Sequence, residues 1–192
     1  MKAVILALAL AFSAGAFANA ADEQGKARQE FSGVAVSIGT PGNPTGVAPV
    51  DIVVTRWSTP QERQRLVTAF SGEGQGGALD ELQDMKSVGT IRINRQGLAY
   101  DLRYAREFRN EDGGRRIFLL TDRPIGAWEA FVQPRYSDYP FTLIEMRLDR
   151  DGRGSGTITL AARITAREDG RFVQIENYAT SPIQFNDVKQ TK

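Results

Sequence analysis

From Val88 onward, hydrophobic side chains recur at every second position, which is the period of a β-strand with one buried face. Asp-Gly pairs separate these stretches, and their glycines supply the positive φ that a tight hairpin turn requires. Successive hairpins without crossover helices indicate an antiparallel meander. The predicted fold class is therefore mainly β (α+β), an antiparallel β-sandwich or flattened barrel. The three Asp-Gly pairs are Asp112-Gly113, Asp151-Gly152 and Asp169-Gly170.

The same alternation predicts where the strands lie. Within 98–108, the side chains of Tyr100, Leu102, Tyr104 and Phe108 are expected to point to one face of a single strand. A last, short apolar piece is expected to add an edge strand. The expected strands cover 34–38, 51–57, 88–93, 98–108, 115–121, 141–149, 156–166, 171–179 and 183–188.

A helical hairpin is expected between the second and third strands. Thr59, Pro60 and Glu62 form a capping box with proline at the first helical position. The glycines of 72–77 end this helix, and a second short helix is predicted up to about Lys86. The apolar stripe expected to dock the hairpin on the sheet consists of Leu66, Val67, Phe70, Leu79 and Leu82.

The N-terminal residues have the three parts of a secretory signal peptide: Lys2, a short apolar run, and a small-residue site ending at Ala20. We expect cleavage after Ala20 and an exported protein, periplasmic or secreted. The apolar run is too short to span about 30 Å of hydrocarbon. Residues 1–20 are thus assigned to the signal peptide, 21–30 to a flexible polar leader, and 31–192 to a single β-rich domain.

Composition excludes several classes of function. Without residues 1–20 the chain carries 23 basic and 23 acidic residues, so it has no long-range field to attract nucleic acid or anionic lipid. We therefore expect no nucleic-acid partner and no stable membrane insertion. Cysteine and histidine are both absent, which excludes disulfides, catalytic triads, thiol nucleophiles and His- or Cys-ligated zinc. No cofactor and no metal are expected.

The chain carries a set of short motifs: Trp57-Ser58-Thr59, residues 100–106, residues 121–125 with Trp128-Glu129, residues 138–145, residues 149–156 and residues 175–178. Together these motifs resemble a family of uncharacterised secreted bacterial proteins. The resemblance covers most of the chain after residue 20. It implies a single exported domain, and because that family has no established activity, it implies no site residues.

The long irregular stretch 122–140 is the first candidate site, because long loops in compact domains tend to be functional. It combines aromatic rings with arginines, the residue types that bind sugars, carboxylates or a partner protein. Arg103 would join this pocket if its side chain projects toward the loop. In the alternative interpretation, Trp128 plugs the end of the barrel and the charges are solvated pairs. The predicted binding residues are Arg103, Arg123, Trp128, Arg135 and Tyr139.

Carboxylates offer a second possibility. Glycoside hydrolysis needs two carboxyl groups and no histidine, and Glu129, Asp138 and Glu145 are the candidates. Glu145 alternates with apolar neighbours, however, which favours a solvent-facing position on a strand. The start of 149–156 is similar to a calcium loop but lacks the closing glutamate, so a hairpin turn is the favoured interpretation. No catalytic residue is therefore assigned.

Five arginines cluster on two strands joined by one tight turn. They form either an anion-binding ladder or the wet face of a sheet, and the interleaved carboxylates favour the wet face. The arginines are Arg103, Arg106, Arg109, Arg115 and Arg116, and the expected cross-strand partners are Asp101, Glu107, Glu111 and Asp112.

These observations favour a non-catalytic function. We expect an exported binding or envelope-associated protein whose partner is a small molecule, a glycan or an envelope protein. The alternative is a carboxylate-dependent, glycosidase-like hydrolase acting on extracellular or envelope polysaccharide.

Overall fold

Two four-stranded meanders, one joining strand and one further short strand make up the ten-stranded sheet in a computed structural model of the chain. The structure describes residues 28–38, 45–72, 74–123, 125, 141–166, 173–177 and 183–192. The first meander and its helices are β1 (Gln29–Ser37), β2 (Gly46–Val54), α1 (Pro60–Gly72), α2 (Gly74–Asp84), β3 (Gly89–Ile93) and β4 (Ala99–Leu102). The remaining strands are β5 (Tyr104–Arg109), β6 (Arg115–Leu120), β7 (Phe141–Leu148), β8 (Arg153–Ala166), β9 (Val173–Asn177) and β10 (Ile183–Gln190).

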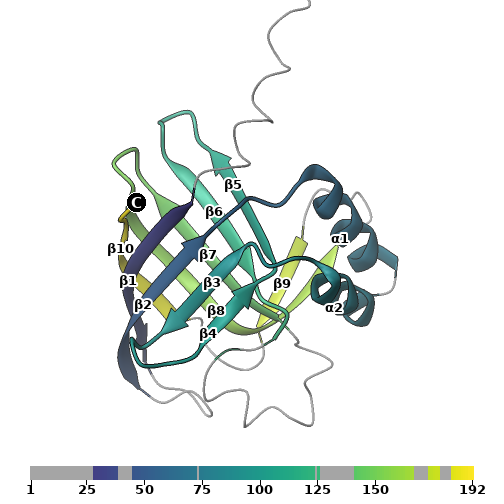
Figure 1. Cartoon of the computed structure of the whole chain (residues 1–192), viewed down its shortest axis with the longest axis horizontal. Helices are drawn as coiled ribbons and strands as arrows, with labels where there is room; N and C mark the ends of the chain where they lie inside the picture. The colour runs from purple at the N-terminus through teal and green to yellow at the C-terminus, as the bar shows by residue number, and fades with distance from the viewer. Residues whose placement is uncertain are drawn as a thin grey trace, which may run out of the picture.

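Every strand pair among the described residues is antiparallel, and the sheet is nearly closed into a barrel (Figure 1). The strand order is β4-β3-β2-β1-β10-β8-β7-β6-β5, and β9 pairs with β8 beside this path. The helical hairpin is inserted between β2 and β3 and lies at one side of the barrel. The predicted fold class is confirmed, in its barrel form.

The position of β10 differs from the prediction. Instead of an edge strand, β10 lies between β1 and β8, where Phe185 pairs with Ala35 on one side and Gly156 on the other. The strand β1 begins at Gln29, so the last two residues of the predicted leader belong to the sheet. The C-terminal residues lie beside the start of β1, because the Thr191 N–H donates to the carbonyl of Glu30 at 2.8 Å.

The predicted single strand 98–108 is divided at Arg103. Leu102 pairs with Gly89 of β3, whereas Tyr104 pairs with Leu120 of β6, so the chain changes partner at this corner. The alternation also shifts by one residue. Leu102 and Ala105 both point into the barrel, and Tyr104 therefore lies on the outer face, contrary to the predicted one-sided row.

Residues 57–59 fill the gap where β4 gives way to β5. Trp57 is buried in the barrel core, and the Ser58 N–H donates to the carbonyl of Ala105 at 2.9 Å. The capping box is confirmed, since the Thr59 N–H donates to Glu62 at 2.8 Å and the Glu62 N–H donates to the Thr59 hydroxyl at 3.2 Å. This segment therefore both covers the edge of β5 and starts α1 at Pro60.

The described residues form two separate apolar cores. The barrel interior is filled by side chains from nine strands, including Phe31, Ile117 and Phe185. The second core lies outside the barrel, where the helical hairpin covers part of its wall (Figure 1). The members of this second core are Leu66, Phe70, Ala78, Leu82, Met85, Tyr104, Leu120, Phe141 and Leu143.

Two of the predicted Asp-Gly turns are confirmed. Gly113 and Gly152 have φ of 82° and 73°, a region that side chains other than glycine rarely adopt. The third turn at 169–170, the signal peptide 1–20 and the predicted leader up to residue 27 lie outside the described residues. Within the part that is described, no helix is both long and apolar enough to cross a membrane.

Candidate binding surface

Two of the five predicted binding residues meet on one carboxylate. Asp122 lies two residues after the end of β6, and its side chain is 6% exposed. Its Oδ2 atom lies 3.1 Å from Nε of Arg103, and its Oδ1 atom lies 3.5 Å from Nε of Arg123. The structure therefore brings Arg103 and Arg123 together at Asp122, the first residue of the 122–140 segment. Trp128, Arg135 and Tyr139 lie outside the described residues.

Arg103 is held mainly by the protein itself. Besides Asp122, its guanidinium donates to the carbonyl of Met85, the residue after α2, at 3.2 Å. Oδ2 of Asp101 lies 3.5 Å from Nη2 of Arg103, and the Arg103 side chain is only 20% exposed. Arg103 thus joins the strand corner, the end of the helical hairpin and the start of the 122–140 segment. Arg123 is 49% exposed and keeps more of its donors for solvent or a ligand.

The two ends of the 122–140 segment are fixed to each other. The Thr121 N–H donates to the carbonyl of Thr142 at 3.0 Å. The Thr142 N–H donates back to the Thr121 hydroxyl at 3.0 Å. Thr121 and Thr142 are both fully buried, so the segment begins and ends at one point of the barrel wall.

Of the three carboxylates proposed for hydrolysis, only Glu145 lies in the described residues. It accepts hydrogen bonds from Arg147 at 2.8 Å and from Arg116 at 2.9 Å. Burial by itself raises the pKa of Glu145, but the two arginines outweigh burial and hold the pKa below its ordinary value. Glu145 is therefore a charged acceptor at neutral pH and a poor general acid. Glu129 and Asp138 lie outside the described residues.

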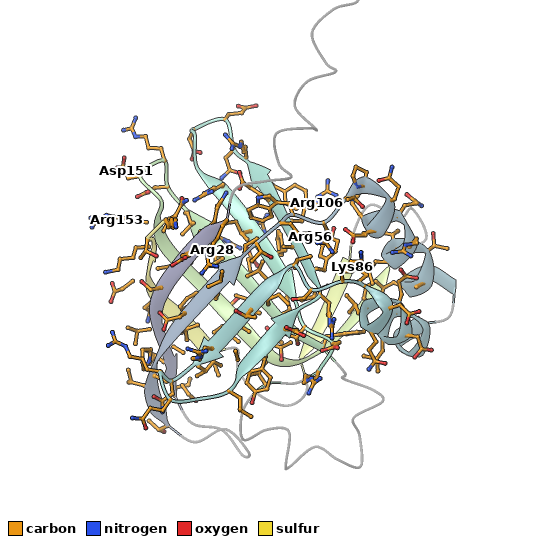
Figure 2. The ribbon with its side chains drawn as sticks, viewed as in Figure 1. Arg28, Arg56, Lys86, Arg106, Asp151 and Arg153 are labelled. Carbon is orange, nitrogen blue, oxygen red and sulfur yellow. The ribbon has the colours of Figure 1, made fainter. Side chains whose placement is uncertain are left out.

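The Asp-x-Asp-Gly stretch forms a turn, as the sequence analysis favoured. Oδ1 of Asp149 accepts the N–H groups of Asp151 and Arg153, both at 2.9 Å. This carboxylate is therefore used in closing the β7–β8 hairpin, which lies across the barrel from the helices (Figure 2). In the described part of the chain, no group of three or more acidic side chains could hold a metal ion.

The clustered arginines of β5 and β6 are divided between the two faces of the barrel wall. Arg115 points into the open end of the barrel. There its Nη1 atom lies 3.3 Å from Oε2 of Glu107, and its guanidinium carbon lies 5.7 Å from the centroid of the Phe31 ring. It also donates to Gln29 at 3.0 Å and to Gln190. The Glu107 side chain is 3% exposed, so this network is a buried polar plug.

The alternate arginines lie on the outer face and stack on aromatic rings. The guanidinium of Arg106 lies 4.7 Å above Phe108, and that of Arg116 lies 5.1 Å above Phe118. The two rings meet edge to face at 5.7 Å. Phe108 is 43% exposed, so an apolar ring is presented to solvent between two cations.

Pairing between strands produces this arrangement. Arg106 pairs with Phe118 and Phe108 pairs with Arg116, so cations and rings alternate in both directions. Arg116 in turn pairs with Arg147 of β7. A sequence signal for this surface does exist, because Arg-x-Phe occurs on both strands of the hairpin, at 106–108 and at 116–118. The wet-face interpretation did not use that repeat.

The outer surface carries more positive than negative charge. Tyr104 contacts the guanidinium of Arg106, and Arg63 of α1 is close enough to act on its charge. Burial raises the pKa of the Tyr104 phenol, and the two arginines oppose that shift. We define the arginine–aromatic face as Arg63, Arg106, Arg116 and Arg147 with Tyr104, Phe108 and Phe118.

Among the described residues, one carboxylate forms ion pairs with these cations. Glu145 pairs with both Arg116 and Arg147. Among the described residues, neither Arg63 nor Arg106 has a carboxylate within ion-pair distance. Arg106 lies on β5, at the side of the barrel that α1 flanks (Figure 2). The arginine–aromatic face thus combines four planar cations, one shared anion and one exposed ring.

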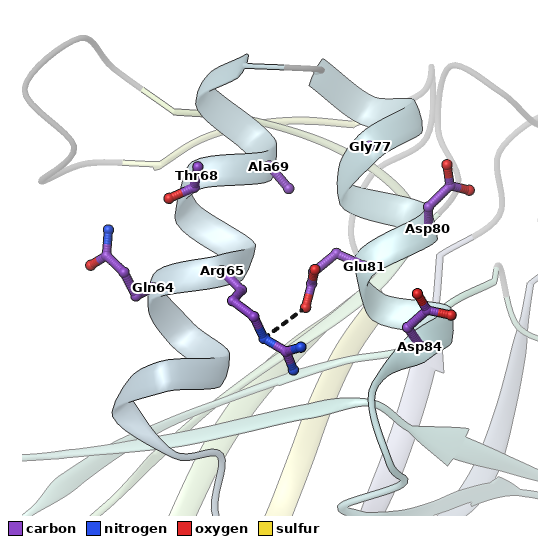
Figure 3. A pocket seen from close by; sticks show the side chains of 8 residues that line it. All are labelled: Gln64, Arg65, Thr68, Ala69, Gly77, Asp80, Glu81 and Asp84. Atoms are coloured by element: carbon purple, nitrogen blue, oxygen red, sulfur yellow. Dashed lines mark ion pairs between the residues drawn. The ribbon is translucent and has the colours of Figure 1, made fainter.

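A groove of about 480 Å³ lies between the two helices. Its centre is crossed by the ion pair between Arg65 and Glu81, 3.1 Å apart, while Asp80 and Asp84 point away from α1 (Figure 3). The charges in the groove are therefore partly neutralised within the hairpin. It offers a ligand less uncompensated charge than the arginine–aromatic face.

No family model, curated protein or solved structure matches this chain. The resemblance to uncharacterised secreted proteins therefore stays a prediction, and the geometry of the described residues supports the functional conclusion.

Proposed function

We propose that this chain is an exported, non-catalytic binding protein, secreted or associated with the cell envelope, whose ligand contacts the arginine–aromatic face. One observation carries the proposal: Arg106 stacks on the half-exposed Phe108 without a carboxylate partner among the described residues. A partly exposed arginine stacked on an exposed ring contributes little to stability, so both side chains remain available to a ligand. Arginine and aromatic residues are also the types most enriched in binding surfaces.

The chemistry of the chain supports a non-catalytic function. Histidine and cysteine are absent from the whole sequence. Glu145 is held ionised by two arginines, which gives no support to the alternative of a carboxylate-dependent hydrolase. The barrel interior is filled by apolar side chains, which favours recognition on an outer surface.

Export rests on residues 1–20, and N-terminal sequencing tests it. The full chain is produced in a Gram-negative host, and the periplasmic and medium fractions are separated from the cytoplasm. Protein that begins at Ala21 outside the cytoplasm is the expected result. Protein that keeps Met1 and stays in the cytoplasm contradicts export.

Binding is tested with the mature chain against four immobilised probes: an acidic polysaccharide, a neutral polysaccharide, anionic vesicles and double-stranded DNA. We expect saturable binding to at least one probe, weakened by Arg106→Ala. Arg92→Ala is the matched control, because Arg92 is an exposed strand arginine on the other meander. If no probe binds, or if both variants bind like the natural sequence, this function is wrong.

A further inference from the structure

We infer that the arginine–aromatic face binds an acidic polysaccharide, with uronate carboxylates on its arginines and a sugar ring on Phe108. This inference rests on the proposed function and names its ligand class. It follows from the shape of the surface, the kind of cation it presents, and the exposed ring beside those cations.

The shape favours an extended ligand. The face comprises the outer sides of β5, β6 and β7, with Arg63 contributed by α1. Arg106, Arg116 and Arg147 present one cation on each of three successive strands, β5, β6 and β7. Because neighbouring strands lie about 4.8 Å apart, these cations follow one another at short intervals across the sheet. A charged polymer lying across the strands can meet these cations in turn, whereas a small ligand would find no enclosing walls there.

The cations favour carboxylates. All four are arginines, whose planar guanidinium groups bind a carboxylate through two parallel hydrogen bonds. Within the protein, Glu145 accepts one hydrogen bond from each of Arg116 and Arg147, both on its Oε1 atom, so these arginines already bind a carboxylate. A uronate carboxylate can extend the same pattern to Arg106 and Arg63.

The exposed ring favours a sugar over a plain polyanion. Phe108 is flanked by Arg106 and packs edge to face on Phe118, so its ring is held in position. The C–H face of a pyranose ring is flat and apolar, and burying it on Phe108 removes apolar surface from water. A ligand with both carboxylates and such faces matches both features at once.

The net charge of the chain argues against two other polyanionic ligands, nucleic acid and anionic bilayers. Without residues 1–20 the chain is formally neutral, so it lacks the field that draws proteins to nucleic acid or to anionic bilayers. Among the described residues, the arginine–aromatic face combines four arginines with one paired carboxylate, which suits short-range contact with further carboxylates.

The experiment compares polygalacturonate with two matched probes, using titration calorimetry on the mature chain. Fully methyl-esterified polygalacturonate keeps the sugar rings and removes the charge, and polyglutamate keeps the carboxylates and removes the rings. We expect polygalacturonate to bind, its ester to lose detectable binding, and polyglutamate to bind at least about tenfold more weakly. Raising the salt concentration should weaken binding further, because exposed charges are screened.

Variants assign the binding to this face. Arg106→Ala and Phe108→Ala are each expected to lower affinity for polygalacturonate about fivefold. Because the two side chains are in contact, their effects are coupled, and the double variant should lose less than the product of the two, under about 25-fold. Arg92→Ala should leave affinity unchanged. Thermal unfolding of each variant verifies that the fold is retained.

The outcomes separate this inference from the proposed function. If polyglutamate binds as tightly as polygalacturonate and Phe108→Ala has no effect, the sugar assignment is wrong and the binding function remains. The same holds if anionic vesicles or DNA bind at this face and polygalacturonate does not. If nothing binds, both the ligand class and the binding function are wrong.

Discussion

Arg115 and Arg116 are neighbours in the chain, yet they occupy opposite environments. Arg115 points into the barrel end, where a carboxylate, two amides and a ring surround it. Arg116 points outward and shares one carboxylate with Arg147. The comparison shows that position along the strand, rather than residue type, decides whether an arginine of this hairpin supports the fold or is offered to a ligand.

The largest expected effect is from Arg115→Ala. Removing this cation leaves Glu107 buried with only the exposed Arg109 as its partner, which should cost about 2–4 kcal/mol of unfolding free energy. Urea denaturation measures the loss. Glu107→Gln combined with Arg115→Ala should recover part of it, and an equal loss in the double variant would contradict a buried charge as the cause.

Arg103→Ala is expected to cost less, about 1–2 kcal/mol, because Arg103 is partly exposed while Asp122 is buried. The measurement is again urea denaturation, with Arg123→Ala as the control on the same carboxylate. Since Arg123 is half exposed and 3.5 Å away, its loss should matter little. If the two variants lose equal stability, Arg103 does not hold the corner.

Glu145 should give a smaller, pH-dependent effect. Its pKa in the folded chain is below the ordinary value of 4.5, so its contribution is complete above that value and disappears as the pH falls through the folded pKa. Glu145→Gln should therefore cost about 1 kcal/mol or less near neutral pH and progressively less in acid. Denaturation at a series of pH values tests this. A difference that grows in acid has the wrong sign.

Arg106→Ala should have the smallest effect on stability, within about 0.5 kcal/mol, because Arg106 lies on an outer face without an ion pair among the described residues. Thermal unfolding checks this value. A loss comparable with that of Arg115→Ala would remove the contrast between the two faces and with it the argument for a binding surface.

Much of the fold was predictable from local patterns. The capping box at Thr59 and the turns at Gly113 and Gly152 depend on neighbouring residues, so the sequence alone shows them. The corner at Arg103 was hidden, because apolar residues continue at alternate positions on both sides of it although the inward face changes. The interior position of β10 depends on partners more than a hundred residues away in β1, which no local pattern encodes.

The candidate site was less predictable. The meeting of Arg103 and Arg123 near one carboxylate follows from the strand corner, which periodicity did not reveal. The arginine–aromatic face carried a visible repeat, Arg-x-Phe on both strands. Whether this repeat forms a positively charged surface depends on which neighbouring carboxylates point into the barrel. Glu107 does, whereas Glu145 lies on the outer face.

The place of β10 has a consequence for how the molecule assembles. Residues 183–190 insert between β1 and the second meander, so β10 is the strand that joins the two meanders into one sheet. A nascent chain that has not yet released them holds two unjoined sheets, in which β1 and residues 153–158 of β8 lack the partner strand that β10 supplies. The two meanders can therefore join only after β10 is released, and truncation before Ile183 would leave a template for aggregation rather than a smaller barrel.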